Sequence, residues 1–289
     1  MKIIKYLSLV LVIVLTASCE KHEIQYDSTT AVGLAEFQLH YCNPVISGSA
    51  NNIYRIEIND SLYGNKTAPL NTYNAVPNGG VGRFFTVAPG NVNVKLYLTA
   101  KLAPKGDSLV YDQDVTLTAT KQNVFVHDFN LPPVVFDNGY PYSRNTTTTT
   151  DSTAWVKFYN FLYELPDSTN ILRIQYQYLD LRTGLPVNIG PPVKFGETTG
   201  WQPVTIVKLP NQIVSAGYRQ MTFNMRVIDD NGIDQGKLKI MNPSGVFVDY
   251  TYTQTTSDPT YIGRRYHHIF AGYRAVKAPN SSVRIFTAL

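Results

Sequence analysis

The sequence predicts an all-β protein in which two tandem Ig-like antiparallel β-sandwich domains follow a lipoprotein signal peptide. The composition favours strands, because aromatic residues reach 12% while charged residues make up only 16%. Short runs in which apolar and polar residues alternate recur along the chain, and turn residues separate them. The pattern of the first half then restarts near residue 154, which indicates a second copy of the same kind of domain.

Residues 1–18 have the pattern of a signal peptide. Two lysines precede an apolar run over residues 6–15, which is too short to cross a hydrocarbon core of about 30 Å. Small residues, Ala17 and Ser18, then lead directly to Cys19, and a lipoprotein signal peptidase requires a cysteine at this place. We therefore expect that Cys19 is acylated and that the lipid anchors the protein in the outer membrane, on its periplasmic or its surface-exposed face.

A tether is expected over residues 19–33. Its first residues after the cysteine, 20–23, read Glu-Lys-His-Glu and resemble the short charged tags that direct lipoproteins of Bacteroidetes-type bacteria to the cell surface. A solvated stub that only keeps the acylated end soluble explains them equally well.

The first sandwich is expected over residues 34–133. Turn residues at 88–91 predict a hairpin that joins the strands 83–87 and 92–98. A second turn is expected at 59–64. The predicted strands of this domain are 37–42, 53–58, 83–87, 92–98, 115–118 and 124–129.

A Thr- and Pro-rich linker is expected over residues 134–153, because this stretch has no apolar periodicity. The second sandwich follows over 154–289, and residues 234–260 form an insertion that the first domain lacks. The predicted strands of this domain are 155–161, 172–176, 193–196, 204–207, 221–228 and 266–273.

Both halves resemble the domain-of-unknown-function 4397 family, which consists of Ig-like sandwiches in exported bacterial lipoproteins. The resemblance depends on a first strand over 156–161 that contains Asn160, and on a Phe-Gly-x-x-x-x-Trp segment from Phe195 to Trp201. In the first half, the Val-Ala-Pro-Gly segment at 87–90 takes the matching place. The resemblance implies the sandwich fold and brings no catalytic residues with it.

Aromatic side chains are the candidate ligand contacts. Trp201, Tyr250 and Tyr252 could stack on sugar rings, and the two tyrosines would share one face of a strand. Tyrosine is also a common half-buried strand residue, and we favour this structural role over a ligand contact by about two to one. Residues 229–234 offer several oxygens as a calcium loop does, but an Asn-Gly turn accounts for them more simply, so no metal is expected.

Asp-Ser followed by Leu or Thr occurs five times, where chance predicts about one. These motifs resemble the acceptor motif for O-glycosylation of exported Bacteroidetes proteins. Asp-Ser is also ordinary turn chemistry. The candidate acceptors are Ser28, Ser61, Ser108, Ser152 and Ser168.

The expected function is non-catalytic. The sequence has no Gly-x-Ser-x-Gly nucleophile elbow and no phosphate-binding glycine loop, so we expect neither an enzyme nor a cofactor. The net charge of +4 is small and dispersed, which gives no reason to expect a nucleic-acid partner. We expect a surface lipoprotein that binds a carbohydrate or an extracellular partner. The alternative is a structural or assembly subunit of an outer-membrane complex.

Overall fold

The computed structural model describes residues 33–46, 48–65, 67, 69–77, 84–98, 108–139, 153–180, 182–206, 218–255, 259–277 and, by backbone alone, 282–288. These residues form an all-β fold of two β-sandwiches, as the sequence predicts. A single 3-10 turn, η1 (Ser49–Asn51), interrupts the strands of this described part. The signal peptide and Cys19 lie outside the described residues.

The first sandwich consists of two sheets. Its outer sheet has the order β3-β2-β6-β7, and its inner sheet has the order β4-β1-β8-β9, with β5 also paired to β1. The strands of the outer sheet are β2 (Ile53–Ile58), β3 (Ser61–Gly64), β6 (Gly90–Leu98) and β7 (Ser108–Leu117), and those of the inner sheet are β1 (Ala35–Tyr41), β4 (Ala75–Val76), β5 (Phe85–Val87), β8 (Lys121–Val126) and β9 (Val134–Asp137).

The second sandwich repeats this plan. Its inner sheet has the order β11-β10-β22-β23 with β14 on β10, and its outer sheet has the order β13-β12-β16-β17 with β20 on β16. The inner strands are β10 (Thr153–Leu165), β11 (Ser168–Thr169), β14 (Gln202–Thr205), β22 (Arg265–Tyr273) and β23 (Ser282–Ala288), and the outer strands are β12 (Arg173–Asp180), β13 (Leu185–Val193), β16 (Thr222–Ile228), β17 (Asp234–Lys237) and β20 (Thr251–Thr253).

Two features of the pairing differ from the sequence expectation. The first strand of each sandwich lies parallel, not antiparallel, to a late strand: β1 pairs with β8, and β10 pairs with β22. The predicted hairpin at 88–91 is also wrong, because β5 pairs with β1 of the inner sheet while β6 belongs to the outer sheet. Turn residues predict that the chain reverses direction there, but they do not determine which sheet the next strand joins.

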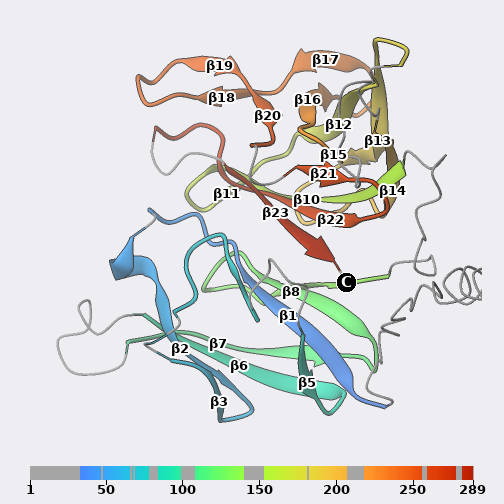
Figure 1. Cartoon of the computed structure of the whole chain (residues 1–289). Coiled ribbons are helices and arrows are strands. Elements are labelled where there is room, and N and C mark those ends of the chain that lie inside the picture. Colours follow the sequence, from blue (N-terminus) through green and yellow to red (C-terminus); the bar gives the residue numbers. More distant parts are fainter. Residues whose placement is uncertain are drawn as a thin grey trace, which may run out of the picture.

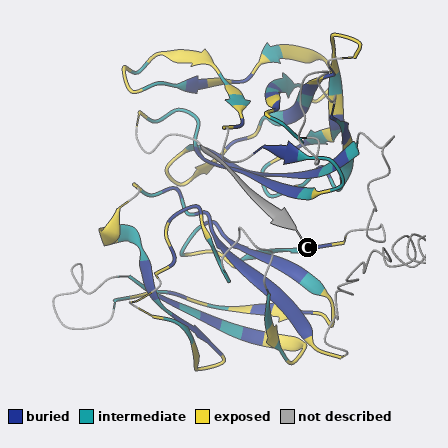
Figure 2. Ribbon diagram, viewed as in Figure 1, coloured by how far each residue is buried: buried dark blue, intermediate teal, exposed yellow. Residues whose placement is uncertain are grey.

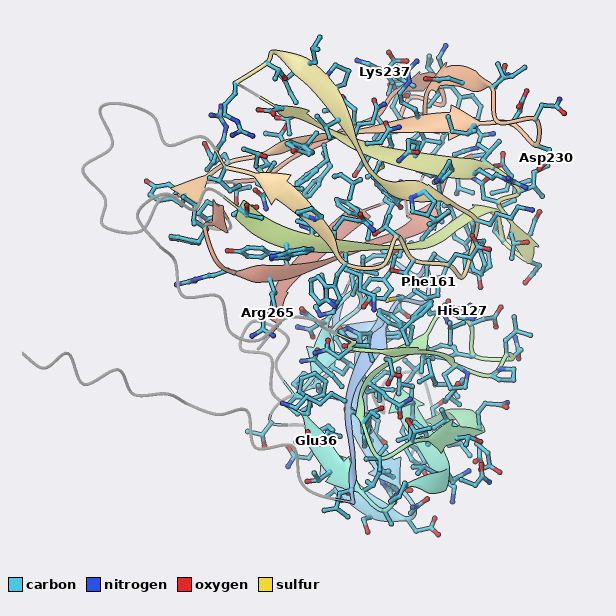
Figure 3. All side chains as sticks on the ribbon, turned by 90° about the vertical axis from the view of Figure 1, so that its right-hand side faces the viewer. Glu36, His127, Phe161, Asp230, Lys237 and Arg265 are labelled. Carbon is cyan, nitrogen blue, oxygen red and sulfur yellow. The ribbon has the colours of Figure 1, made fainter. Side chains whose placement is uncertain are left out.

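The two sandwiches pack face to face, so that four sheets are stacked in the order outer, inner, inner, outer (Figure 1). Three buried apolar clusters fill the three spaces between the sheets. The middle cluster joins the two inner sheets, and Figure 3 shows Phe161 and His127 where the sandwiches meet. Its buried members are Cys42, Tyr73, Phe125, Tyr159, Phe161, Ile269 and Ala271.

Both faces of the inner sheets are therefore buried. Every residue of β1 is buried, and so are most residues of β8, β10 and β22, which Figure 2 shows in dark blue. A sheet that is covered on both sides has near-continuous apolar strands, which explains the run of apolar residues in β10. This packing turns the two domains into one four-layered body.

The predicted linker is wrong at its start. Residues 134–137 form β9, which pairs with β8 over Phe125↔Val134 to Gln122↔Asp137. Val135 packs in the first sandwich while Val134 and Phe136 pack in the middle cluster. Because both faces of β9 pack against apolar side chains, its residues do not alternate between apolar and polar, and the sequence pattern did not reveal the strand. Residues 140–152, with the threonine run, lie outside the described residues.

The predicted insertion over 234–260 is wrong at both ends. Residues at its start form β17 and residues near its end form β20, and both strands pair with β16 of the second outer sheet. The addition to the sandwich is a separate hairpin between them, formed by β18 (Lys239–Met241) and β19 (Phe247–Asp249). A further two-stranded sheet pairs β15 (Tyr218–Arg219) with β21 (Thr260–Tyr261).

Candidate functional site

Trp201 lies at the junction of the two sandwiches. Its indole Nε1 donates a hydrogen bond of 2.7 Å to the backbone oxygen of Asn138, which follows β9 in the first sandwich. The ring is half-buried and stands edge-on to His267 at 4.7 Å between ring centroids. Beside it, the Lys157 ammonium donates to the Asp137 backbone oxygen at 2.9 Å. Trp201 therefore connects one sandwich to the other through its ring N–H group.

Tyr250 and Tyr252 pack inward, against the core of the second sandwich. The Tyr250 ring is stacked on Phe270 at 5.4 Å, and the Tyr252 ring is stacked on Phe223 at 5.8 Å. Burial raises the pKa of Tyr250 to about 12. The two tyrosines do share a side, as the sequence predicts, but that side is the core. The structure does not bring them together with Trp201, since the second inner sheet lies between.

The loop over residues 229–234 is a turn between β16 and β17. The Asp229 carboxylate accepts hydrogen bonds from the backbone N–H groups of Asn231 and Ile233. Gly232 has the positive φ of 81° that such a turn favours. Among the residues that the structure describes, no group of three or more His, Cys, Asp or Glu side chains could hold a metal ion.

The histidines on β22 point to opposite faces, as their adjacent positions predict. His267 meets Tyr159 in the middle layer, where its Nδ1 lies 2.8 Å from the tyrosine hydroxyl. His268 is stacked on Phe158 in the core of the second sandwich, 4.5 Å between ring centroids. Burial lowers the pKa of both imidazoles, to about 3 for His268. Neither ring is exposed to solvent, and both remain neutral.

Two of the candidate acceptor serines lie at exposed hairpin turns. Ser61 begins β3 and Ser168 begins β11, and the aspartate before each has a positive φ of 60°. Ser108 begins β7 and is half-buried. Ser28 and Ser152 lie outside the described residues.

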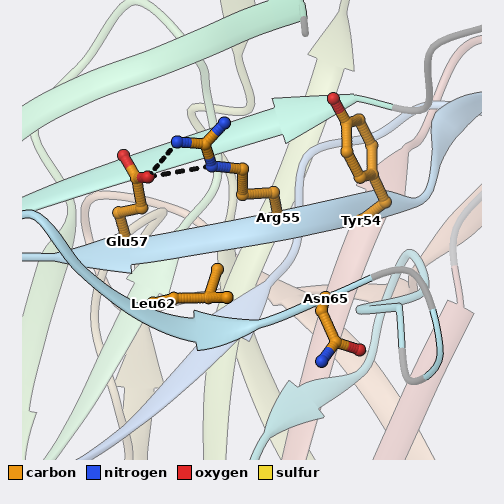
Figure 4. A pocket seen from close by; sticks show the side chains of 5 residues that line it. All are labelled: Tyr54, Arg55, Glu57, Leu62 and Asn65. Carbon is orange, nitrogen blue, oxygen red and sulfur yellow. Dashed lines mark hydrogen bonds and ion pairs between the residues drawn. The ribbon is translucent and has the colours of Figure 1, made fainter.

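A groove on the open face of the first outer sheet is a better candidate for a binding site. It has a volume of about 330 Å³, which lies at the lower end of the range of small-molecule sites. Figure 4 shows that its side chains come from β2 and from β3 with the residue after it. The lining residues are Tyr54, Arg55, Glu57, Leu62 and Asn65.

The polar groups of this groove are held in place before any ligand arrives. Arg55 and Glu57 lie two residues apart on β2, so that both side chains point out of the same face. The Arg55 guanidinium donates from Nε to Glu57 Oε1 at 2.8 Å and lies over the Tyr97 ring, 4.6 Å from its centroid. The Tyr97 hydroxyl donates to the other carboxylate oxygen at 2.8 Å. These hydrogen bonds lower the pKa of Glu57, so its charge is retained in mildly acidic solution.

Apolar surface lies directly beside these polar groups. Leu62, opposite Glu57 in the β2–β3 pairing, is 62% exposed. The Asn65 amide stands exposed at the end of β3. An apolar contact next to a few fixed donors and acceptors is the arrangement that small-ligand sites use.

Sequence reasoning missed this site because its residues lie in an ordinary alternating strand. The run Ile53 to Ile58 predicts a strand with one buried face, and it says nothing about which solvent-facing residues matter. The available signal was the pair Arg55 and Glu57 on one face, followed by Leu62 after a tight turn at Asn59–Asp60.

No protein-family profile and no curated protein matches this chain. Among solved structures, a leucine-rich repeat protein from Bacteroides thetaiotaomicron is 11% identical with a TM-score of 0.19; the match covers 85% of this chain and 26% of that one. The chain thus spans about a quarter of that protein's length. A candidate cell adhesion protein from Bacteroides fragilis is 9% identical with a TM-score of 0.24, over 88% of this chain and 97% of that one.

No helix within the described residues is long and apolar enough to span a membrane.

Proposed function

We propose that this chain is a non-catalytic lipoprotein of the outer membrane that binds a carbohydrate in the groove of its first outer sheet. The observation that supports the proposal is the fixed Arg55–Glu57–Tyr97 cluster beside the exposed side chain of Leu62. The resemblance to exported lipoprotein domains without known catalytic residues agrees with a binding role.

A sugar suits this groove chemically. Its hydroxyl groups can accept from the Arg55 guanidinium and the Asn65 amide and donate to the Glu57 carboxylate. Its C–H face can lie on Leu62, where it would cover apolar surface that is now in water. Because the ion pair is already formed, binding loses little side-chain entropy in Arg55 and Glu57.

We expect that replacing Arg55 by Ala weakens retention on the polysaccharide that binds. A charge-assisted hydrogen bond contributes roughly 1.5–3 kcal/mol, so affinity should fall about tenfold or more. Affinity electrophoresis of the mature chain against a set of polysaccharides measures this, with Leu62→Ala as a second variant that leaves the ion pair intact. Arg226→Ala is the matched control, because Arg226 forms an equivalent exposed ion pair with Asp234 on the second outer sheet. Equal losses in Arg55→Ala and Arg226→Ala, or no retardation on any polysaccharide, would overturn the proposed site.

The lipid anchor can be tested by mass and by labelling. In the native host, the mature chain should carry palmitate on Cys19, and Cys19→Ala should abolish palmitate labelling. Cys42→Ala is the control that should keep the palmitate labelling, because Cys42 is buried between the sandwiches and burial raises the pKa of its thiol.

Glycosylation of the Asp-Ser motifs would make the intact mass larger than that of the acylated polypeptide. Among the described candidates, Ser61 and Ser168 are the exposed acceptors. A mass equal to the acylated polypeptide contradicts glycosylation.

A further inference from the structure

The edges of the four sheets differ in how well they are protected against pairing with another strand. Unpaired edges attract foreign strands, and natural proteins protect them with short strands, prolines, bulges or charges. In the described part of the chain, the edge strands β3, β4, β9, β11 and β17 have four residues or fewer. Three edge strands of this part are longer: β7, β13 and β23. β13 contains three prolines, Pro186, Pro191 and Pro192, which cannot donate to a neighbouring strand, and β23 has seven residues that include an arginine.

Strand β7 lacks these protections. It has ten residues, SLVYDQDVTL, without proline, lysine or arginine, and within the described residues it pairs only with β6. Its single irregularity lies at its start, and the pairing from Leu96↔Tyr111 to Gly90↔Leu117 is regular. Tyr111, Val115 and Leu117 are anchored in the core of the first sandwich, so the strand cannot slip. Within the part of the chain that the structure describes, one side of β7 thus has backbone N–H and C=O groups that pair with no strand.

The charged side chains of β7 lie over the sheet and leave this edge open. Asp112 and Asp114 are exposed on its outer face. The Asn93 amide donates to Asp112 Oδ1 at 2.9 Å and to Asp114 Oδ1 at 3.0 Å, and the Asn91 amide donates to Asp114 Oδ2 at 3.0 Å. Both carboxylates are therefore drawn toward β6, away from the free edge.

The same carboxylates determine which strand fits. A second copy of the chain that paired antiparallel about residues 112–114 would set Asp112 opposite Asp114 of the other copy, and like charges directly opposite are destabilising. A strand with lysines at alternate positions would instead bring opposite charges into cross-strand contact. Lys95 on β6 lies opposite Asp112, but its ammonium donates to Asp60 Oδ1 at 2.6 Å, on the side away from the free edge of β7.

We propose that β7 is a docking edge to which another protein adds an extended segment with lysine at alternate positions. The added strand extends the first outer sheet to the order β3-β2-β6-β7-partner. Backbone hydrogen bonds supply the affinity and the two aspartates supply the specificity, as in other cases of strand addition. This surface lies at the opposite edge of the sheet from the groove, so its success or failure is independent of carbohydrate binding.

Hydrogen exchange of the whole mature chain tests the proposal. The probe is a capped peptide of about eight residues with alternating Val and Lys, a length that matches an ordinary strand. We expect alternate backbone amides of β7 to exchange quickly in the free chain and at least about tenfold more slowly with the peptide. A peptide with alternating Val and Glu should give no protection. The double variant Asp112→Lys, Asp114→Lys should reverse this preference, and Asp249→Lys, an exposed change on β19 of the second half, should not.

Three results would overturn the proposal. Equal protection by both peptides would mean that charge does not select the partner. No protection by either would mean that β7 does not accept a strand. Protection of all β7 amides in the free chain would mean that the edge is already covered, by a second copy if the protection rises with protein concentration and by the chain itself if it does not.

Discussion

Lowering the pH from 7 to 5 is expected to remove about 4–6 kcal/mol from the free energy of unfolding, through His40, His267 and His268. Burial lowers the pKa of His40 to about 4 and that of His268 to about 3, and it holds the pKa of His267 well below its usual value. In the unfolded chain each imidazole has its ordinary pKa of about 6.5, so the unfolded state binds more protons below that pH. Each histidine therefore costs the folded state about 2 kcal/mol by pH 5.

The sign and the window follow from these pKa directions. A histidine whose pKa is lowered on folding destabilises the folded state as the pH falls below the pKa of the unfolded chain. The free energy of unfolding therefore begins to fall near pH 6.5, and for His40 it continues to fall until about pH 4. Most carboxylates titrate below this window, which isolates the histidines. Urea unfolding at pH 7 and pH 5 measures the change. A total stability of 5–15 kcal/mol is typical, so the expected loss is a large fraction of it.

His268→Phe is the matched control for this prediction. His268 is fully buried among aromatic rings, and among the described residues neither ring nitrogen has a hydrogen-bond partner. A phenyl ring can keep the stacking on Phe158 without two unsatisfied nitrogens, so stability at pH 7 should be unchanged or higher. The slope of stability between pH 6.5 and 5 should fall by about 1 kcal/mol per pH unit. An unchanged slope would show that His268 is protonated in the fold or not buried.

The sequence predicted the fold class because strand formation is a local property. Alternation in Ile53–Ile58 and in Thr222–Ile228 marks strands with one face in the core, and the structure has both. What alternation could not reveal was the contact between the sandwiches. In β1, the polar residues Glu36, Gln38 and His40 alternate with apolar ones, a pattern typical of a solvent-facing side, yet all three are buried.

The role of the aromatic residues was ambiguous for a related reason. A tyrosine or tryptophan is chemically suited both to a ligand and to a half-buried junction, and the one-dimensional pattern does not distinguish them. The structure resolves the ambiguity by position: Trp201 donates across the junction to Asn138, and Tyr250 lies on Phe270. The long apolar run of β10 was the overlooked signal, since every residue from Trp155 to Tyr163 except Lys157 and Asn160 is apolar or aromatic, on both faces of the strand. Such a run indicates a strand that is covered on both sides.

Replacing Phe161 by Ala should therefore cost about 3–5 kcal/mol of unfolding free energy, the usual loss for a buried phenylalanine. Phe161 is fully buried in the middle layer, with ring centroids 5.0 Å from Phe125, 5.6 Å from His127 and 6.0 Å from Phe195. Phe125 and His127 belong to the first sandwich, whereas Phe161 and Phe195 belong to the second. The variant leaves a cavity in the layer that holds the sandwiches together, so the single unfolding transition expected of the intact chain should broaden or split.

Leu165→Ala on the same strand is the control, because Leu165 is 45% exposed and a surface change of this kind stays within about 0.5 kcal/mol. The comparison discriminates between two arrangements of the same strands. If the domains were joined only by a linker, Phe161 would lie on the solvent face of an isolated sandwich, and both variants would behave alike. A large loss for Phe161 alone, measured by urea unfolding at pH 7, requires a partner sheet over that face. Equal small losses would mean that the two sandwiches do not pack together. His40 and His267 would then lack the burial that lowers their pKa.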